Sequence, residues 1–245
     1  MKKYKNGAEL FADARRSLLG NLSVAVWSFL LYTSITLLLN QIGSSFSFRS
    51  SSLSLLTNLT AGLITSVFAS MLGVGLSSVF LNLQYGQPAS VRDLLLPFLE
   101  NADRTVRIRF FVTTGEYVSL LPLQFLLYYI SADEILKNIP LVLGMSLLCF
   151  IAFTYWVTTY AMVNYLLLDF PDRHPGMILA ASRKMMQGSR IRFILLILRL
   201  IPLHLLGIFS FGLANIWIGC CQHACTAAFY KDLMTPRSKA AAKQA

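Results

Sequence analysis

The sequence predicts an all-α polytopic membrane protein that crosses a bilayer six times. Of its 245 residues, 56% are hydrophobic and only 13% are charged, whereas soluble domains carry about 25% charged residues. The apolar residues form runs long enough to cross about 30 Å of hydrocarbon as helices, and the basic residues lie between these runs. Segments in lipid must satisfy their own backbone hydrogen bonds, so spans of this kind have to be helical.

Four spans follow directly from the apolar runs. They cover Leu22–Ile42, Ala61–Leu83, Phe110–Ile130 and Ile139–Leu167. Each run reaches or exceeds the roughly 20 residues that a crossing needs. The first run is not followed by a small-residue cleavage site, so we expect it to be a retained span and not a signal peptide.

The last apolar stretch, Phe193–Tyr230, is too long for a single crossing. As one helix it would measure roughly 57 Å at about 1.5 Å per residue. We expect a turn at Phe209-Ser210-Phe211-Gly212, which divides the stretch into two short spans, Phe193–Ile208 and Leu213–Phe229. One crossing followed by a helix in the interface is the alternative.

The distribution of charge favours six spans with both ends in the cytoplasm. The chain has a net charge of +10, and cytoplasmic loops attract Lys and Arg. With the N-terminus inside, only Arg49 and Lys137 of the flanking basic residues fall outside. Five spans would put Arg237 and Lys239 on the outer side. We therefore expect a plasma-membrane protein with one membrane domain, 1–233, and a basic cytoplasmic tail, 234–245. The topology accounts for the positive charge, so no nucleic-acid partner is expected.

Sequence similarity within the chain indicates three repeat units. The segment Arg107-Ile108-Arg109-Phe110 returns 83 residues later as Arg190-Ile191-Arg192-Phe193, and Pro88 and Pro171 have the same separation. Arg15 to Asn21 can be aligned on Arg183 to Ser189, 168 residues later. We expect each unit to be a cytoplasmic amphipathic helix followed by a two-span hairpin.

The cytoplasmic helices carry start signals and apolar faces. Asn6 with Glu9 and Ser90 with Asp93 match capping boxes, and Pro175 suits a first helical turn. Such helices could lie on the inner leaflet and contact anionic lipid, or pack on the bundle, and both can hold. The basic residues expected to contact lipid are Arg15, Arg16, Arg104, Arg107, Arg109, Arg183, Lys184, Arg190 and Arg192.

Glu116 and Arg199 are the charged residues inside the predicted spans, and a lone charge there is costly. Each lies seven residues after the second arginine of its repeat, so both should reach a similar depth. This spacing predicts an ion pair between them. The pair could be a structural lock, or it could form a proton or substrate path together with His204.

No enzyme site is visible in the sequence. It lacks a nucleophile with a base, paired carboxylates and a phosphate-binding glycine loop, so we expect neither catalysis nor a cofactor. Cys221, His223 and Cys225 could approach one another on a helix, but their spacing is not that of a zinc site. They are weak metal candidates beside the alternative that they pack in the core.

Three segments carry a resemblance to a known family. They are Ser182 to Gly188, Gly212 to Trp217 and Phe229-Tyr230-Lys231-Asp232-Leu233. Together they resemble a bacterial family of integral membrane proteins classed as domain of unknown function nine-seven-five. Weaker similarity extends back through Gly75 and Asp93-Leu94. Cys220-Cys221 stands where that family usually has Pro-Tyr. The resemblance implies a multi-span membrane protein and supplies no activity or site residues.

These observations predict a non-catalytic, envelope-associated scaffold or interaction protein. Its expected partners are the lipid bilayer, anionic inner-leaflet lipids and either another membrane protein or a second copy of the chain. A small transporter or channel that uses Glu116, Arg199 and His204 is the alternative. A transporter should contain a continuous polar path, whereas a scaffold should have a filled centre and an outward-facing groove.

Overall fold

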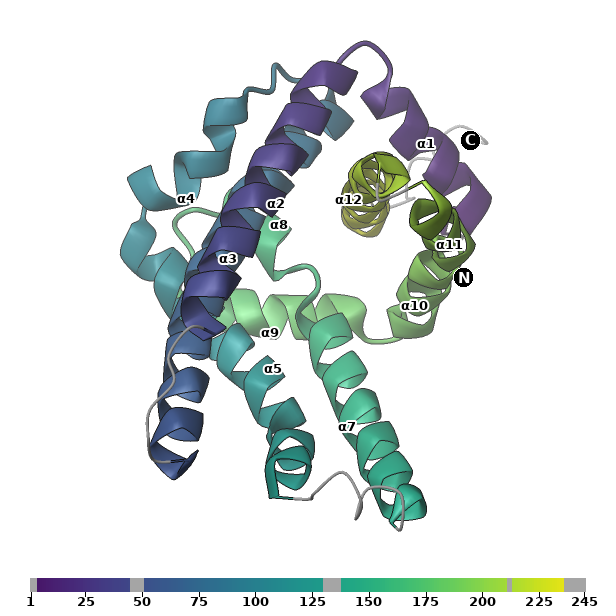
Figure 1. The fold of residues 1–245 in the computed structure, drawn as a ribbon. Coiled ribbons are helices and arrows are strands. Elements are labelled where there is room, and N and C mark those ends of the chain that lie inside the picture. Colours follow the sequence, from purple (N-terminus) through teal and green to yellow (C-terminus); the bar gives the residue numbers. More distant parts are fainter. Residues whose placement is uncertain (1–3, 45–50, 130–137, 211–212, 236–245) are drawn as a thin grey trace.

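A computed structural model describes residues 4–44, 51–129, 138–210 and 213–235, and every regular element in these ranges is a helix (Figure 1). The all-α prediction is confirmed for this part of the chain. Arg49, Lys137, the end of the third predicted span at Ile130, the Phe211-Gly212 part of the predicted turn, and most of the predicted tail lie outside the described residues.

The three predicted units serve only to divide the chain, and the first contains α1 (Gly7–Leu18), α2 (Leu22–Ser44) and α3 (Ser51–Tyr85). The predicted capping box starts α1: Asn6 accepts a hydrogen bond from the helix backbone, and Glu9 accepts one from the Asn6 amide at 3.3 Å. Helices α2 and α3 pack side by side along their length, as expected for a hairpin.

The second unit begins with the 3-10 helix η1 (Val91–Leu95) and the short α4 (Leu96–Leu99), followed by α5 (Ala102–Tyr129), α7 (Ile139–Tyr160) and α8 (Val163–Asp169). Ser90 and Asp93 form the second predicted capping box. Helix α5 packs against α7, and the two project together from the rest of the molecule. The predicted fourth span is interrupted at Ala161-Met162, where α8 begins a new segment.

The third unit consists of α9 (Pro175–Met186), α10 (Arg190–Leu198), α11 (Ile201–Phe209) and α12 (Leu213–Met234). The predicted fifth span is therefore two short helices, divided at Arg199-Leu200, and Pro202 is the second residue of α11. A proline two residues into a helix lacks the amide hydrogen that would continue the preceding one. Figure 1 shows α12 almost end-on, whereas α2, α5 and α7 lie across the view.

The structure contains four helical segments that are long and apolar enough to cross a membrane, which makes this a multi-pass membrane protein. They are Leu22–Ile42, Leu56–Tyr85, Ala102–Tyr128 and Ile139–Asp169. The fifth and sixth predicted spans are not among them. Helices α10 and α11 have nine residues each, and α12 carries Gln222, His223 and Thr226 in its middle.

Helices α1 and α9 correspond closely in position and geometry. Each has 12 residues, and their bounds are 168 residues apart. The buried residues of α1 are Leu10, Ala14 and Leu18, and those of α9 are Ile178, Ser182 and Met186, at the same separation. Both helices are followed by a glycine with positive φ, Gly20 at 93° and Gly188 at 80°. Their apolar sides pack on the bundle, which is one of the two placements expected for these helices.

Helix α12 lies at the centre of the core. It packs on α1, α2, α3, α10 and α11, and its buried residues include Cys220, Ala224 and Phe229. The close approach of α12 to α2 depends on Gly219, because a Cβ at this position would overlap the ring of Phe29 on α2. The next residue, Cys220, has its Sγ 3.6 Å from the carbonyl oxygen of Ala25. Cys220 thus lies at a tight contact between α12 and α2.

Gly75 on α3 allows the second unit to fold back on the first. A Cβ at this position would overlap the backbone carbonyl of Leu94 in η1, whereas a Cβ at Gly73 would meet the Tyr32 hydroxyl at an ordinary 3.8 Å. Asn82, also on α3, donates to the Asp93 carboxylate at 3.2 Å. The family-like residues Gly75 and Asp93-Leu94 therefore meet at one contact between the two units.

Gly75→Ala should lower the free energy of unfolding by about 1–3 kcal/mol, because the added methyl must displace backbone. Gly73→Ala is the matched control on the same helix and should change it by less than about 1 kcal/mol. Unfolding of the purified protein in mixed detergent micelles measures both. Equal effects of the two substitutions would contradict the close contact at Gly75.

Candidate functional site

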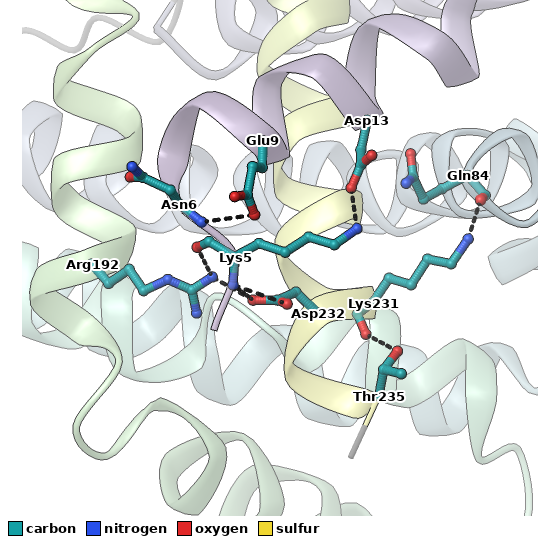
Figure 2. Close-up of polar contacts among 9 residues, drawn as sticks. All are labelled: Lys5, Asn6, Glu9, Asp13, Gln84, Arg192, Lys231, Asp232 and Thr235. Carbon is teal, nitrogen blue, oxygen red and sulfur yellow. Dashed lines mark hydrogen bonds and ion pairs between the residues drawn. The ribbon is translucent and has the colours of Figure 1, made fainter. Parts of the chain in front are cut away.

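Polar contacts join the two ends of the described chain, as Figure 2 shows. Lys5 precedes α1, Arg192 lies in the first turn of α10, and Lys231 and Asp232 lie in the last turns of α12. We call these four residues the terminal junction. Helix α1 packs across α12, so the extended residues before α1 are held against the end of the last helix.

Asp232 is the centre of the terminal junction. Its carboxylate accepts hydrogen bonds from the Lys5 amide at 3.3 and 3.4 Å, and it forms an ion pair with Arg192. The Arg192 guanidinium also donates to the Lys5 carbonyl at 2.8 Å. The Asp232 side chain is 6% exposed and that of Arg192 is 23% exposed. A pair removed from water to this extent is stable only when hydrogen bonds satisfy both partners.

The residues before Asp232 each contact a different part of the fold. The Phe229 ring packs on Phe193 at 5.2 Å, and the Tyr230 ring stacks on Tyr165 at 5.0 Å. Tyr230 also donates its hydroxyl to Asp169 at 2.5 Å.

Lys231 turns towards α3 and donates to the Gln84 carbonyl at 2.6 Å. The segment Phe229–Asp232 therefore joins α10, α8, α3 and the residues before α1. Sequence reasoning singled out this segment only through the family resemblance, because its partners lie far away along the chain.

A cavity of about 550 Å³ opens beside the terminal junction. Its lining combines Lys5, which precedes α1, with the second half of α1 and the ends of α3 and α12. The charged residues in the lining are Lys5, Asp13, Arg16, Lys231 and Asp232. Lys5 pairs with Asp13 on α1, so one wall of the cavity is a lysine side chain laid along that helix (Figure 2).

The predicted ion pair between Glu116 and Arg199 is absent: the ion pairs found within the described residues are Lys5 with Asp13 and Arg192 with Asp232. The Arg199 guanidinium lies beside Gly7 at the start of α1. Arg199 lies at the break between α10 and α11, which directs its side chain to α1. His204 contacts the carbonyl of Leu200, four residues earlier on the chain, at 2.9 Å, so the structure does not unite the three residues.

Glu116 instead lies near Arg109, seven residues earlier on α5, and the two interact electrostatically. Arg109 donates to the Asn164 side chain at 3.0 Å, and Asn164 donates to the Ser77 hydroxyl at 3.3 Å. Tyr32 on α2 also interacts with both charges. We call these five residues the α5 polar cluster. The repeated Arg-Ile-Arg-Phe segment was the available signal, because Arg109 and Arg192 occupy the same place in it and both turn inward.

The nine basic residues expected to contact lipid fall into two groups. Four make contacts within the protein: Arg104 with the carbonyls of Phe170 and Pro171, Arg109 with Asn164, Arg190 with the ring of Tyr155, and Arg192 with Asp232. The other five are exposed: Arg15, Arg16, Arg107, Arg183 and Lys184. Only the second group is therefore free to contact lipid headgroups or solvent.

His223 lies among aromatic rings and not among other ligands. Its ring is 5.5 Å from that of Phe80, 5.9 Å from that of Phe29 and 6.4 Å from that of Tyr32. Cys221 and Cys225 are buried free thiols. In the part of the chain that the structure describes, no three His, Cys, Asp or Glu side chains gather as metal ligands.

Asp232→Asn should lower the free energy of unfolding by about 2–3 kcal/mol, because it leaves the partly buried Arg192 without a counter-charge. Asp13→Asn is the matched control, since the Lys5–Asp13 pair is more exposed and should contribute at most about 1 kcal/mol. Detergent unfolding measures both. Adding Arg192→Gln to Asp232→Asn should recover part of the loss, and equal effects of the two single substitutions would exclude a central role for Asp232.

Comparison with known proteins gives one result. The family described as "Protein of unknown function (DUF975)" matches residues 5–237. No curated protein and no solved structure matches the chain. The matched range includes both ends of the terminal junction and the segments that carry the resemblance in the sequence. The chain therefore belongs to the DUF975 family.

Proposed function

We propose that this protein is a non-catalytic scaffold or interaction protein of a bacterial plasma membrane. The observation that carries the proposal is the terminal junction, where the ends of the described chain are fixed to each other by a partly buried ion pair. Next to Asp232, the Tyr230 ring stacks on Tyr165 and holds α12 against α8. An arrangement of this kind favours a stable platform over a moving gate.

Six spans with both ends in the cytoplasm are part of the proposal. The packing of α11 on α12 supports a third hairpin, since a Cβ at Gly207 would overlap the Asn215 side chain. The matched geometry of α1 and α9 supports repeat units. The second unit has a similar turn before its long helix. Asn101, which precedes α5, has a positive φ of 53°, and Gly20 before α2 and Gly188 before α10 have positive φ values too. The clustering of basic residues between spans supports the orientation.

The α5–α7 hairpin offers surfaces for lipid or for a membrane partner. Two apolar grooves of about 600 and 580 Å³ flank α7, and Leu147 lines both of them. Grooves of this kind fit acyl chains, the helix of another membrane protein or a second copy of the chain. The five exposed basic residues would contact anionic inner-leaflet lipids. The proposal includes no nucleic-acid partner, no cofactor and no catalytic residue.

A small transporter remains a second candidate because of the α5 polar cluster. Ionisable residues within a span are expensive and often belong to a transport path. Glu116 with Arg109 would be the central pair of such a path. Arg199 lies beside Gly7 and His204 contacts the Leu200 carbonyl, so neither extends the α5 polar cluster into a longer path. This favours the scaffold.

Cysteine labelling tests the number of spans. In a background without the native cysteines, Ser210→Cys lies between α11 and α12 and should react with an impermeant thiol reagent added outside the cell. Asn138→Cys should react from outside too, while Gln187→Cys should react only after the membrane is opened. Protection of Ser210→Cys in intact cells would contradict six spans and favour an interior α11–α12 pair.

Complementation tests the scaffold against the transporter. In a strain that lacks the gene, Glu116→Gln should restore the wild-type phenotype, because a scaffold needs the shape of the α5 polar cluster and not its charge. Asp232→Asn should restore it poorly, since it weakens the terminal junction. The comparison requires equal membrane levels of the variants by immunoblot. Normal levels of Glu116→Gln without restored growth would favour transport.

A further inference from the structure

We propose that the cavity beside the terminal junction binds a phosphate ester that carries a hydroxyl group, held by Arg16, Lys231 and Gln84. This ligand site goes beyond the proposed scaffold role and relies only on the cytoplasmic placement of the cavity. The argument depends on which charges in the lining are already compensated.

Both carboxylates in the cavity lining have a cation of their own. Asp13 pairs with Lys5, and Asp232 pairs with Arg192, which lies behind the cavity wall. Arg16 is exposed and takes part in no ion pair within the described residues. Lys231 has a backbone carbonyl and the Tyr85 ring as neighbours, with its Nζ 4.8 Å from the ring centroid. Two positive charges are thus left without a carboxylate partner, and the cavity favours an anion.

The residue types favour phosphate over other anions. An arginine presents a planar set of donors that matches phosphate oxygens, and a lysine adds a point charge. The two come from different helices, α1 and α12, so one tetrahedral anion between them would be held from two sides. Neither needs to give up an ion pair to bind it.

Gln84 indicates a second polar group on the ligand. Gln84 lines the cavity, and its side-chain oxygen is buried and has no hydrogen-bond partner. A buried acceptor without a donor costs free energy, and a hydroxyl group on the ligand would supply the donor. A cavity of about 550 Å³ accommodates a glycerol phosphate unit, either free or as the headgroup of phosphatidylglycerol.

Binding to the full-length protein tests the site with two arms. In detergent, calorimetry would measure the affinity for inorganic phosphate and for sn-glycerol 3-phosphate. In nanodiscs, native mass spectrometry would compare retention of phosphatidylglycerol with that of phosphatidylcholine. Arg16→Gln should weaken binding about tenfold, since it removes a charge-assisted contact. Arg16 is exposed, so the variant should fold, and its elution profile and melting temperature would verify this.

Lys184→Gln is the matched control, because Lys184 is exposed at the same place on α9, 168 residues later, and does not line the cavity. It should leave binding unchanged. Gln84→Met should weaken glycerol phosphate and not inorganic phosphate. Binding of the soluble compounds would identify a soluble ligand, and binding of phosphatidylglycerol alone would identify a lipid headgroup.

Equal losses from Arg16→Gln and Lys184→Gln would overturn the site, as would wild-type affinity in Arg16→Gln. Failure of the wild-type protein to bind in both arms would overturn it too. Each of these results leaves the scaffold proposal standing, because that proposal is decided by topology and complementation.

Discussion

Charged groups that leave water must find partners within the chain, and in this protein the arginines meet that requirement by joining distant helices. Arg192 pairs with Asp232 and donates to the Lys5 carbonyl. Arg104 binds the carbonyls at the end of α8, where helix dipoles favour a cation. Arg109 reaches Asn164 across the α5–α8 contact. Each contact fixes the orientation of two elements that apolar packing alone would let slide.

Glycines supply the complementary constraint, since they let helices approach until backbones nearly touch. Gly75 brings η1 onto α3, Gly219 brings α12 onto α2, and Gly115 brings α5 onto the Trp156 ring of α7. In a membrane, where lipid and side chains are equally apolar, close packing and polar contacts are the main forces between helices. The small-residue contacts and the arginine contacts therefore act together around α3 and α12, while the projecting part of α5 and α7 is left with broad apolar surfaces.

Segments that correspond in sequence have similar geometry but different chemistry, as α1 and α9 show. Arg109 and Arg192 occupy the same place in the repeated Arg-Ile-Arg-Phe segment and both turn inward, yet one meets an amide and the other a carboxylate. Arg16 and Lys184 end equivalent helices, yet only Arg16 lines a cavity. The different surroundings of Arg16 and Lys184 explain why the candidate site includes the end of α1 and not the end of α9. Function resides in such local differences and not in the fold itself.

The sequence by itself determined the features that depend on neighbouring residues. The first four apolar segments, the capping boxes at Asn6 and Ser90, and the matched helices α1 and α9 follow from local hydrophobicity, side-chain chemistry and repeat spacing. These signals lie within a few turns of helix or recur at a fixed interval, so they are visible in a linear pattern.

Only the tertiary structure decided how the charges are paired and which elements lie at the centre. The matched positions of Glu116 and Arg199 in their predicted spans suggested that the two residues meet. In the structure, the break after α10 turns Arg199 towards α1, and Glu116 interacts with Arg109. Asp232 gained its role from Lys5, 227 residues away along the chain, and from Arg192. Contacts over such separations depend on how helices cross in three dimensions, and helix crossings leave no periodic trace in the sequence.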